Sequence, residues 1–326
     1  MPDVVMPNVV MPNVMVFGPN PFVSVALESM MGNVDGDEIH FHAAGQGVWV
    51  ARAVAGLGGD ATLVTTRGGE HGTMLAALLA EEPFAATFVG VAGEGACYVD
   101  DRRRGDRTRL AERPADPLSR HEVDDLYGAT LAAGISADIA VLCGTGADER
   151  LPGDFYSRLA HDLRVSGTPV VADLSGSLAE AALSGGVEVL KMSESEVRAL
   201  EDDEREGDSV DLRVEAERLV QRGARRVIVT RGGEPAIAVD ESGLRELHVP
   251  QLATADHRGA GDSMTAAIAI GLAAGDPWED VLTRAAATGA ANVTRRGLGT
   301  SSDAEISAIE ALASTSPPEE TTRTPR

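Results

Sequence analysis

The sequence predicts an α/β fold in which a central, mostly parallel sheet carries helices on both faces, together with a small β-sheet lid. Two observations support this prediction. Short apolar runs alternate with segments of helical periodicity, and this order of elements produces a parallel sheet that is covered on both faces. Two further stretches interrupt the alternation and have strand character of their own.

The alternating elements run from residue 14 to about residue 275. The strand candidates are rich in valine, isoleucine and leucine, as expected for strands buried on both faces. They are residues 14–18, 61–66, 137–144, 168–176, 187–192, 225–230 and 236–239. The helix candidates are residues 47–57, 70–82, 119–133, 153–166, 177–184, 194–200 and 211–222. In such folds the active site lies beyond the carboxyl ends of the strands.

The two interrupting stretches predict the lid. Residues 37–45 alternate with a period of two, and residues 86–112 indicate two or three strands around a charged turn. Exposed β segments inserted into an α/β core are expected to form a small sheet over the site. Such a lid would exclude water from a transfer reaction.

The length of the chain fits one large unit. With 326 residues, 43% of them hydrophobic, it can bury the core of a single α/β domain, which we place at residues 13–313. We assign no function to residues 1–12, an uncertain extension in which Met6 and Met11 are alternative starts. Residues 314–326 are polar and rich in proline, so we expect a disordered tail.

Charge and cysteine content exclude several classes of function. The 28 basic and 51 acidic residues give a net charge of −23, which repels nucleic acids and anionic membranes, so neither is an expected partner. The chain has no segment of transmembrane length, no signal-peptide pattern and only two cysteines, so we expect a cytoplasmic protein. The acidic excess fits a high-salt cytoplasm, and the near absence of lysine also fits a GC-rich genome.

The stretch Arg-Gly-Ala-Gly-Asp-Ser-Met-Thr-Ala-Ala, residues 258–267, places the carboxylate of Asp262 after a glycine turn. Two interpretations are open from these residues alone. Aspartate caps helices, because its side chain accepts backbone N–H groups of the first turn. Alternatively, the small residues let a phosphate approach the positive end of a helix, with a base beside it. The apolar residues that follow predict a buried helix.

Six segments in order resemble the PfkB sugar kinases of the ribokinase superfamily. Residues 256–275 are similar to that family's C-terminal signature, and residues 43–59 to its N-terminal signature. The other four segments are residues 18–22, 170–176, 189–197 and 230–235. The 1-phosphofructokinase and tagatose-6-phosphate kinase branch is the most similar. The resemblance implies a ribokinase-like fold and phosphoryl transfer from ATP to a sugar hydroxyl.

The resemblance favours the catalytic interpretation of the glycine turn. Asp262 matches the base that takes the proton of the acceptor hydroxyl. The backbone N–H groups of Gly259, Ala260 and Gly261 match the anion hole that holds the transferring phosphoryl group.

The resemblance also implies a site for ATP and Mg²⁺. Lys191, the only lysine of the chain, matches the lysine of the nucleotide phosphates. Glu196 matches the glutamate that organises magnesium, and Asp256 an acid near a monovalent-cation site, which K⁺ would occupy. The other residues matched to the nucleotide side are Ser193, Thr230, Gly232, Gly233 and Asn292. Structural alternatives stay open: Glu196 as a solvated carboxylate, and Asp256 and the two glycines as turn residues.

The residues matched to the acceptor site depart from the family pattern. They are Asn20, Ser24, Gly45, Gln46, Gly47, Trp49 and Arg67. Ser24 stands in place of an acid that binds sugar hydroxyls, Gln46 in place of a lysine, and Trp49 in place of an asparagine. Glu94 lies near the place of an arginine that binds the sugar phosphate. Losing two basic contacts would cost about 3 to 6 kcal/mol of binding unless Arg67 or the arginines of the lid turn compensate.

We therefore expect an ATP-dependent kinase of a sugar or sugar phosphate, similar to 1-phosphofructokinase. Trp49 and the missing basic residues leave a nucleoside or another uncharged polyol as an alternative acceptor. Ser24 and Ser193 leave a catalytically weak nucleotide-binding relative as a further alternative. Members of the family often dimerise through their lids, and residues 86–94 are apolar enough to need covering, so we expect a homodimer.

Overall fold

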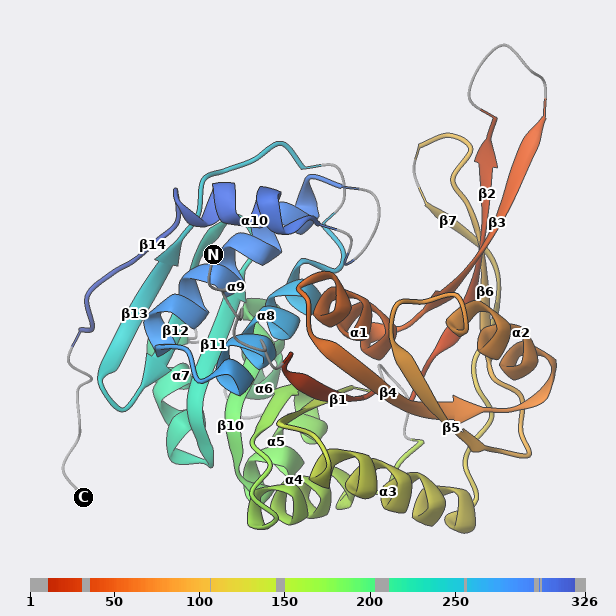
Figure 1. The fold of residues 1–326 in the computed structure, drawn as a ribbon, viewed down its shortest axis with the longest axis horizontal. Coiled ribbons are helices and arrows are strands. Elements are labelled where there is room, and N and C mark those ends of the chain that lie inside the picture. Colours follow the sequence, from red (N-terminus) through yellow and green to blue (C-terminus); the bar gives the residue numbers. More distant parts are fainter. Residues whose placement is uncertain are drawn as a thin grey trace, which may run out of the picture.

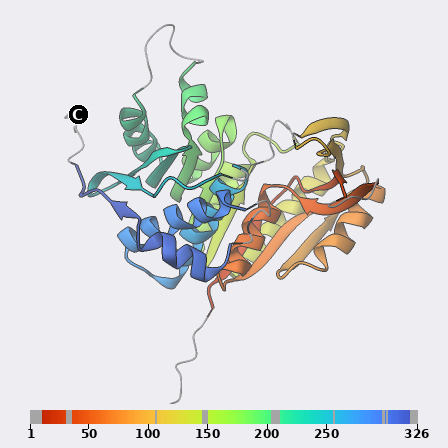
Figure 2. The same ribbon diagram turned by 90° about the horizontal axis from the view of Figure 1, so that it is seen from above.

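The computed structural model describes residues 11–30, 36–105, 107–144, 150–202, 211–254, 257–295, 299 and 301–319. Within these residues a large sheet lies between two layers of helices, and a small second sheet projects from one end of it (Figures 1 and 2). The predicted α/β architecture with a small additional sheet is confirmed. No helix in these ranges is long and apolar enough to cross a membrane.

The large sheet contains the buried strands that the alternation predicts. Its strands are β1 (Asn13–Phe17), β4 (Asp60–Arg67), β5 (Ala85–Gly90), β8 (Ile139–Cys143), β9 (Val170–Asp173), β10 (Val187–Ser193), β11 (Ala224–Arg231), β12 (Glu234–Asp240), β13 (Gly243–His248) and β14 (Ser314–Thr315). Their order is β14-β13-β12-β11-β10-β9-β8-β1-β4-β5. Every pair from β11 to β5 is parallel, whereas β12, β13 and β14 continue the sheet as antiparallel strands.

Helices cover both faces because successive side chains of each strand point to opposite sides. Val14 and Val16 of β1 pack with one helical layer, and Met15 and Phe17 with the other. The first layer is α1 (Gln46–Gly56), α2 (Gly69–Leu79), α8 (Ala260–Ala274) and α9 (Trp278–Val293), with α10 (Asp303–Glu310) on α9. The second layer is α3 (Arg120–Ile135), α4 (Phe155–Val165), α5 (Gly176–Gly185), α6 (Glu194–Asp202) and α7 (Leu212–Gln221).

The small sheet has the order β3-β2-β6-β7 and differs from the prediction in two strands. Its members are β2 (Phe22–Ser29), β3 (Asp37–Ala44), β6 (Ala96–Asp101) and β7 (Thr108–Arg113). The predicted lid segment 86–112 supplies only β6 and β7, because β5 pairs in parallel with β4 at the edge of the large sheet. β2 was not predicted. A half-buried edge strand and a lid strand share the same period of two, so the pattern alone cannot separate them.

The predicted disordered tail is wrong for its first residues. β14 pairs with β13, and Leu244 and Glu319 exchange two backbone hydrogen bonds of 3.0 and 2.8 Å. Arg213 on α7 also contacts the Glu319 carboxylate at 2.7 Å. These contacts extend the sheet at its edge, which polarity and proline content do not reveal. Residues 320–326 and 1–10 lie outside the described residues.

Two glycines set how closely α1 approaches the end of β1. A Cβ atom on Gly47 would lie only 2.6 Å from the Cα of Gly18, and the reverse distance is 2.9 Å. Gly45, which precedes α1, has φ +121°, a backbone conformation that L side chains rarely adopt. These glycines of the N-terminal signature therefore seat the start of α1, with Gln46, directly against the carboxyl end of the central strand.

We expect Gly47→Ala to lower the free energy of unfolding by about 1 to 3 kcal/mol, because the methyl group must displace backbone rather than a flexible side chain. Gly128→Ala in α3 is the matched control. A Cβ there meets nothing within 4 Å, so the change should stabilise the helix by up to about 1 kcal/mol. Urea denaturation of both variants measures the difference, and equal effects would contradict the close-approach argument.

Candidate active site

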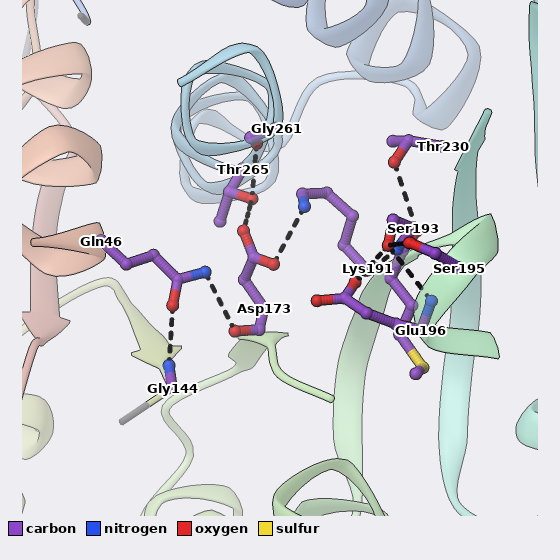
Figure 3. Close-up of polar contacts among 11 residues, drawn as sticks. Gln46, Gly144, Asp173, Lys191, Ser193, Ser195, Glu196, Thr230, Gly261 and Thr265 are labelled. Atoms are coloured by element: carbon purple, nitrogen blue, oxygen red, sulfur yellow. Dashed lines mark hydrogen bonds and ion pairs between the residues drawn. The ribbon is translucent and has the colours of Figure 1, made fainter. Parts of the chain in front are cut away.

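Three side chains from three elements form a buried polar chain at the carboxyl ends of β9 and β10 (Figure 3). Lys191 Nζ donates to Asp173 Oδ1 at 2.9 Å, and Thr265 Oγ1 donates to Asp173 Oδ2 at 2.6 Å. Lys191 is 4% exposed and Asp173 7%, while Thr265 is fully buried. The chain therefore ties α8, which carries Thr265, to two neighbouring strands of the sheet.

Sequence reasoning identified Lys191 but missed its partners. Asp173 ends a fully buried strand and lies directly opposite Lys191 in the parallel register. That position was a usable signal, because a carboxylate at the end of a buried strand needs a partner. Thr265 carried no signal, since threonine in an apolar helix more often bonds its own backbone, as this one also does to the carbonyl of Gly261 at 3.0 Å.

The glycine turn of residues 259–261 lies against the lysine. Gly259 has φ +74° and is the residue that precedes α8, and no side chain caps this helix. The capping interpretation of Asp262 is therefore wrong, and its carboxylate lies in the first turn without bonding the helix end. A Cβ on Gly261 would lie 3.2 Å from Lys191 Nζ. The absence of a side chain at Gly261 therefore lets the Lys191 ammonium lie directly against the turn.

The surroundings of Asp262 raise the pKa of its carboxyl to about 7. Burial is the main cause, repulsion from Asp173 and Glu196 adds to it, and the attraction of Lys191 opposes it. For Lys191, burial acts to lower the pKa, but attraction and hydrogen bonding from Asp173, with help from Asp262 and Glu196, raise it overall. The site thus holds a protonated lysine beside a carboxyl group that exchanges its proton near neutral pH, as a general base requires.

Glu196 and Ser193 form a reciprocal cap at the start of α6. Ser193 donates its backbone N–H (2.7 Å) and its hydroxyl (2.8 Å) to Glu196 Oε2, and its Oγ accepts the Glu196 N–H at 3.3 Å. The Ser-Glu-Ser-Glu spacing is a capping-box signature that sequence reasoning overlooked. The carboxylate still lies near the polar chain (Figure 3), since its charge acts on both Lys191 and Asp262. Glu196 therefore caps the start of α6 and is more than a solvated surface carboxylate.

A cavity of about 570 Å³ lies beside the glycine turn, between the β11–β12 turn and the helices α8 and α9. Six of the predicted residues line it: Ser193, Thr230, Gly232, Gly233, Ala260 and Gly261. Gly232 adopts φ +61° in the turn between β11 and β12, so the turn alternative and the binding role coexist. Further lining residues were not predicted, because an irregular segment carries no periodic signal. They are Val249, Pro250, Gln251, Leu252, Thr254 and His257.

Asn292, which the resemblance matches to the nucleotide side, does not line this cavity. Its side chain is fully buried and donates to the carbonyl of Arg258 at 2.7 Å. It accepts from Ser263 Oγ at 3.2 Å and from the N–H of Gly299 at 2.9 Å. These bonds use the amide to hold the glycine turn on α9. Asp256, the candidate ligand for a monovalent cation, lies outside the described residues.

Gln46 joins two loops at the acceptor end of the site. Its Nε2 donates to the carbonyl of Asp173 at 3.2 Å, and its Oε1 accepts from the N–H of Gly144 at 2.8 Å (Figure 3). Both ends of the amide are therefore engaged by backbone. In this structure Gln46 positions the ends of β8 and β9, a task that the match to a lysine did not suggest.

Of the other acceptor candidates, Asn20 and Trp49 contact side chains of neighbouring segments, whereas Ser24 lies inside the small sheet. Asn20 accepts at its Oδ1 from Arg150, an arginine that sequence reasoning missed, at 3.3 Å. Trp49 meets Phe22 at the start of β2 edge-on, with ring centroids 6.2 Å apart. Ser24, in contrast, is buried within the small sheet, opposite His42 and Tyr98.

Arg67 also falls outside the expected place. Its guanidinium is exposed and lies over the ring of Phe88 on the edge strand β5, 5.8 Å from the centroid. This placement directs the charge toward the edge of the large sheet. In this structure Arg67 contacts Phe88, and its compensating role stays a prediction.

The raised pKa of Asp262 predicts an energetic cost in the folded protein. Between its ordinary value of 3.8 and about 7, the native carboxyl keeps a proton that the unfolded chain has lost, so stability falls as pH rises through this window. We expect Asp262→Asn to raise the free energy of unfolding at about pH 8 by on the order of 2 kcal/mol, after allowing for solvent screening, and to change it little at about pH 4. Urea titrations at both pH values test this against exposed Asp276→Asn. A pH-independent effect would contradict it.

Comparisons with known proteins identify the family of this chain. The chain matches the pfkB family carbohydrate kinase model over residues 11–305. It is 29% identical over 261 residues to the ATP-dependent 6-phosphofructokinase isozyme 2 of Escherichia coli K12, covering 79% of this chain and 83% of that protein. For the protein of the same name from Mycobacterium tuberculosis H37Rv, the identity is 31% over 239 residues, covering 72% and 69%.

Solved structures lead to the same assignment. The crystal structure of phosphofructokinase-2 from Escherichia coli in complex with potassium superposes with a TM-score of 0.81 at 26% identity, covering 92% of this chain and 99% of that one. The ribokinase-like fold is thereby confirmed, and the protein is an ATP-dependent carbohydrate kinase. The chain belongs to the pfkB family of carbohydrate kinases.

Proposed function

We propose that this kinase phosphorylates a hydroxyl of a sugar phosphate, in a reaction of the phosphofructokinase type, with Asp262 as the base. The observation that carries the proposal is the carboxyl group of Asp262, whose pKa is about 7, in the glycine turn beside Lys191. The relatives named 6-phosphofructokinase support fructose 6-phosphate as the first acceptor to test.

In this mechanism each residue has a separate task. Asp262 accepts the proton of the attacking hydroxyl as the new O–P bond forms, while the bond between the γ-phosphorus and the bridging oxygen of ATP breaks and ADP leaves with that oxygen. The N–H groups of Gly259, Ala260 and Gly261 stabilise the charge on the transferring phosphoryl group, and the positive end of α8 adds to that field. Lys191 contacts the nucleotide phosphates, and Asp173 keeps it protonated and fixed.

The cations belong to the nucleotide side. No group of three or more histidine, cysteine or acidic side chains able to hold a metal occurs in the part of the chain that the structure describes. Mg²⁺ bound with a nucleotide needs only one or two carboxylates besides phosphates and waters, so the donor set fits it, with Glu196 as the nearest candidate. When bound, Mg²⁺ would neutralise phosphate charge. A K⁺ site at Asp256 remains part of the proposal, supported by the relative solved with potassium.

Arg102 in the lid turn is the best candidate to replace the missing basic contacts. Arg107 and Arg109 are both paired with the buried Asp100 at 2.6 Å, whereas Arg102 lies 3.8 Å from Glu28 and its buried Nε has no hydrogen-bond partner. Burial is the main cause that lowers the pKa of Arg102, and the nearby charges of Arg258 and Arg107 add to it. An under-neutralised guanidinium between lid and glycine turn suits a phosphate.

An uncharged acceptor, such as a nucleoside or polyol, remains the second candidate. The observation that favours it is the aromatic contact of Trp49 with Phe22, which offers a flat apolar wall where the family pattern has polar groups. The two candidates differ in their need for positive charge at the lid.

The first prediction of the proposal concerns the base. Asp262→Asn should lower kcat by about 100- to 10,000-fold, because the amide cannot accept the proton, and should leave the Kd for ATP unchanged. In the unmodified protein kcat/KM should rise with pH and level off above about 7, following the pKa of Asp262. Stopped and coupled ADP-release assays measure both, with exposed Asp276→Asn as control. Full activity of Asp262→Asn would overturn the assignment, whereas an inactive unmodified protein that binds ATP would favour the nucleotide-binding relative.

The second prediction concerns the acceptor. ADP release across fructose 6-phosphate, fructose 1-phosphate, tagatose 6-phosphate, fructose, ribose and nucleosides, at low and high KCl, should be fastest with a phosphosugar. Arg102→Gln should then raise the acceptor KM about tenfold or more with little change in kcat, because it removes a charge-assisted contact. Arg104→Gln, exposed in the same turn, is the control. Turnover confined to uncharged acceptors, insensitive to Arg102→Gln, would select the second candidate.

We also propose that the protein is a cytoplasmic homodimer joined through the small sheet. Ile39 and Phe41 of β3 are 59% and 47% exposed and alternate onto the same face, so this sheet leaves large apolar side chains uncovered. β5, which supplies most of the apolar segment 86–94, belongs to the large sheet and not to the lid. The proposal therefore depends on β3.

The double change Ile39→Ser and Phe41→Ser should convert a dimer into a monomer, since it removes the apolar contact without touching the core. Light scattering at several salt concentrations measures the mass. Leu312→Ser, which alters a residue that is 70% exposed far along the chain, is the control and should leave the dimer intact. A monomeric unmodified protein, or a dimer that survives the double change, would refute this arrangement.

A further inference from the structure

A second cavity, of about 470 Å³, lies apart from the nucleotide cavity, between the first turns of α3 and α4. Its wall is partly apolar and partly charged. The lining residues are Leu118, Arg120, Val123, Asp124, Tyr127, Arg150, Leu151, Pro152, Asp154, Phe155 and Arg158. None of them contributes to the nucleotide cavity or to the glycine turn.

Three arginines from three separate segments gather at this cavity, against two aspartates. In a chain with 28 basic and 51 acidic residues this local balance is reversed. Arg120 has no hydrogen-bond or ion-pair partner among the described residues. Arg158 lies over the ring of Tyr127, 4.7 Å from its centroid, and only loosely contacts Asp154 at 3.6 Å. The lining thus carries one more positive than negative charge. The carboxylates of Asp116 and Glu122 lie close enough to act on Arg150, and Asp162 accepts from the Tyr127 hydroxyl.

Arg150 connects the cavity to both ends of the lid. Its Nη1 donates to the carbonyl of Pro19 at 3.1 Å and to Asn20 Oδ1 at 3.3 Å, just before the chain enters β2. Its Nε donates to the carbonyl of Asp116 at 3.2 Å, just after the chain leaves β7. One guanidinium therefore clamps two of the four crossings between the lid and the large sheet, namely the first and the last in the sequence.

We propose that this cavity binds a small phosphate monoester with a compact apolar body, and that the bound anion changes the mobility of the lid through Arg150. Arginine forks match phosphate oxygens, and the apolar wall would take the body of the molecule. A charged phosphate is a stronger acceptor than the carbonyls to which Arg150 donates here. The carboxylates of Asp116 and Glu122 already act on Arg150, so a phosphate would compete with them as it redistributes the bonds of the clamp. The binding half of the proposal does not depend on the acceptor of the kinase reaction.

Phenyl phosphate is the probe, and calorimetric titration of the full chain measures its binding with the nucleotide site saturated by a non-hydrolysable ATP analogue. We expect binding that persists in Asp262→Asn and is weakened by about tenfold for each of Arg120→Ser and Arg158→Ser, since each removes one charge-assisted contact. Arg222→Ser, which removes an exposed arginine on another helix, should have no effect, and benzoate should bind more weakly than phenyl phosphate. Absence of binding, or equal binding to the arginine variants, would overturn the site.

A variant that is expected to tighten binding distinguishes the loss of a contact from misfolding. Asp124→Asn removes a negative charge from the cavity and should tighten phenyl phosphate binding, which a damaged fold cannot do. Weaker binding by this variant would contradict the electrostatic argument.

The effect on the lid is read by hydrogen exchange, which needs no kinase activity. Phenyl phosphate should change the exchange of residues 22–29 and 96–113 by at least about twofold, and Arg150→Lys should abolish this change while keeping most of the binding, because an ammonium cannot bridge both crossings. Binding without any change in lid exchange would overturn the coupling. A kinase that proves inactive would refute the proposed function and leave this result standing.

Discussion

The buried ion pair between Lys191 and Asp173 is the contact on which the site depends. It joins two neighbouring strands, and the second oxygen of Asp173 binds Thr265, so the position of α8 is fixed by the same carboxylate. Breaking such a pair leaves an uncompensated buried charge, which costs several kcal/mol. The glycine turn follows from it, because Gly261 lies where any side chain would meet the ammonium.

Burial is the main reason why Asp262 holds its proton more tightly than an ordinary aspartate, and the carboxylates of the same cluster add to it. One ammonium faces the carboxylates of Asp173 and Asp262, with Glu196 close by. The three groups Lys191, Asp173 and Asp262 are neutral in sum only while Asp262 is protonated, and phosphate groups of a nucleotide would add further negative charge. The divalent cation proposed to bind with the nucleotide would offset this negative charge. The raised pKa of Asp262 both suits this carboxyl group to the proposed role of base and lowers the stability of the folded protein.

The sequence predicted the parts of the molecule that repeat a local pattern. The strands and helices of the large sheet follow from periodicity, and Lys191 and the glycine turn follow from motifs. Contacts between distant segments were not predictable in this way: Gln46 bonds the ends of β8 and β9, and Asn292 holds the glycine turn from α9. β5 and the strands of the small sheet share one period, so only hydrogen-bond partners distinguish them. The capping box of Ser193 was readable but was overlooked.

The large negative charge of the chain sets a condition on how it can bind anions. Fields of exposed carboxylates reach about 10 Å at moderate ionic strength, so they oppose the approach of ATP and of phosphosugars from solution. Attraction must then come from short-range groups that salt screens little, namely a buried lysine, a helix end and guanidinium groups near a lid. These are the groups gathered around the glycine turn. Added salt weakens the distant repulsion more than the local attraction, so a salty solvent suits this distribution of charge.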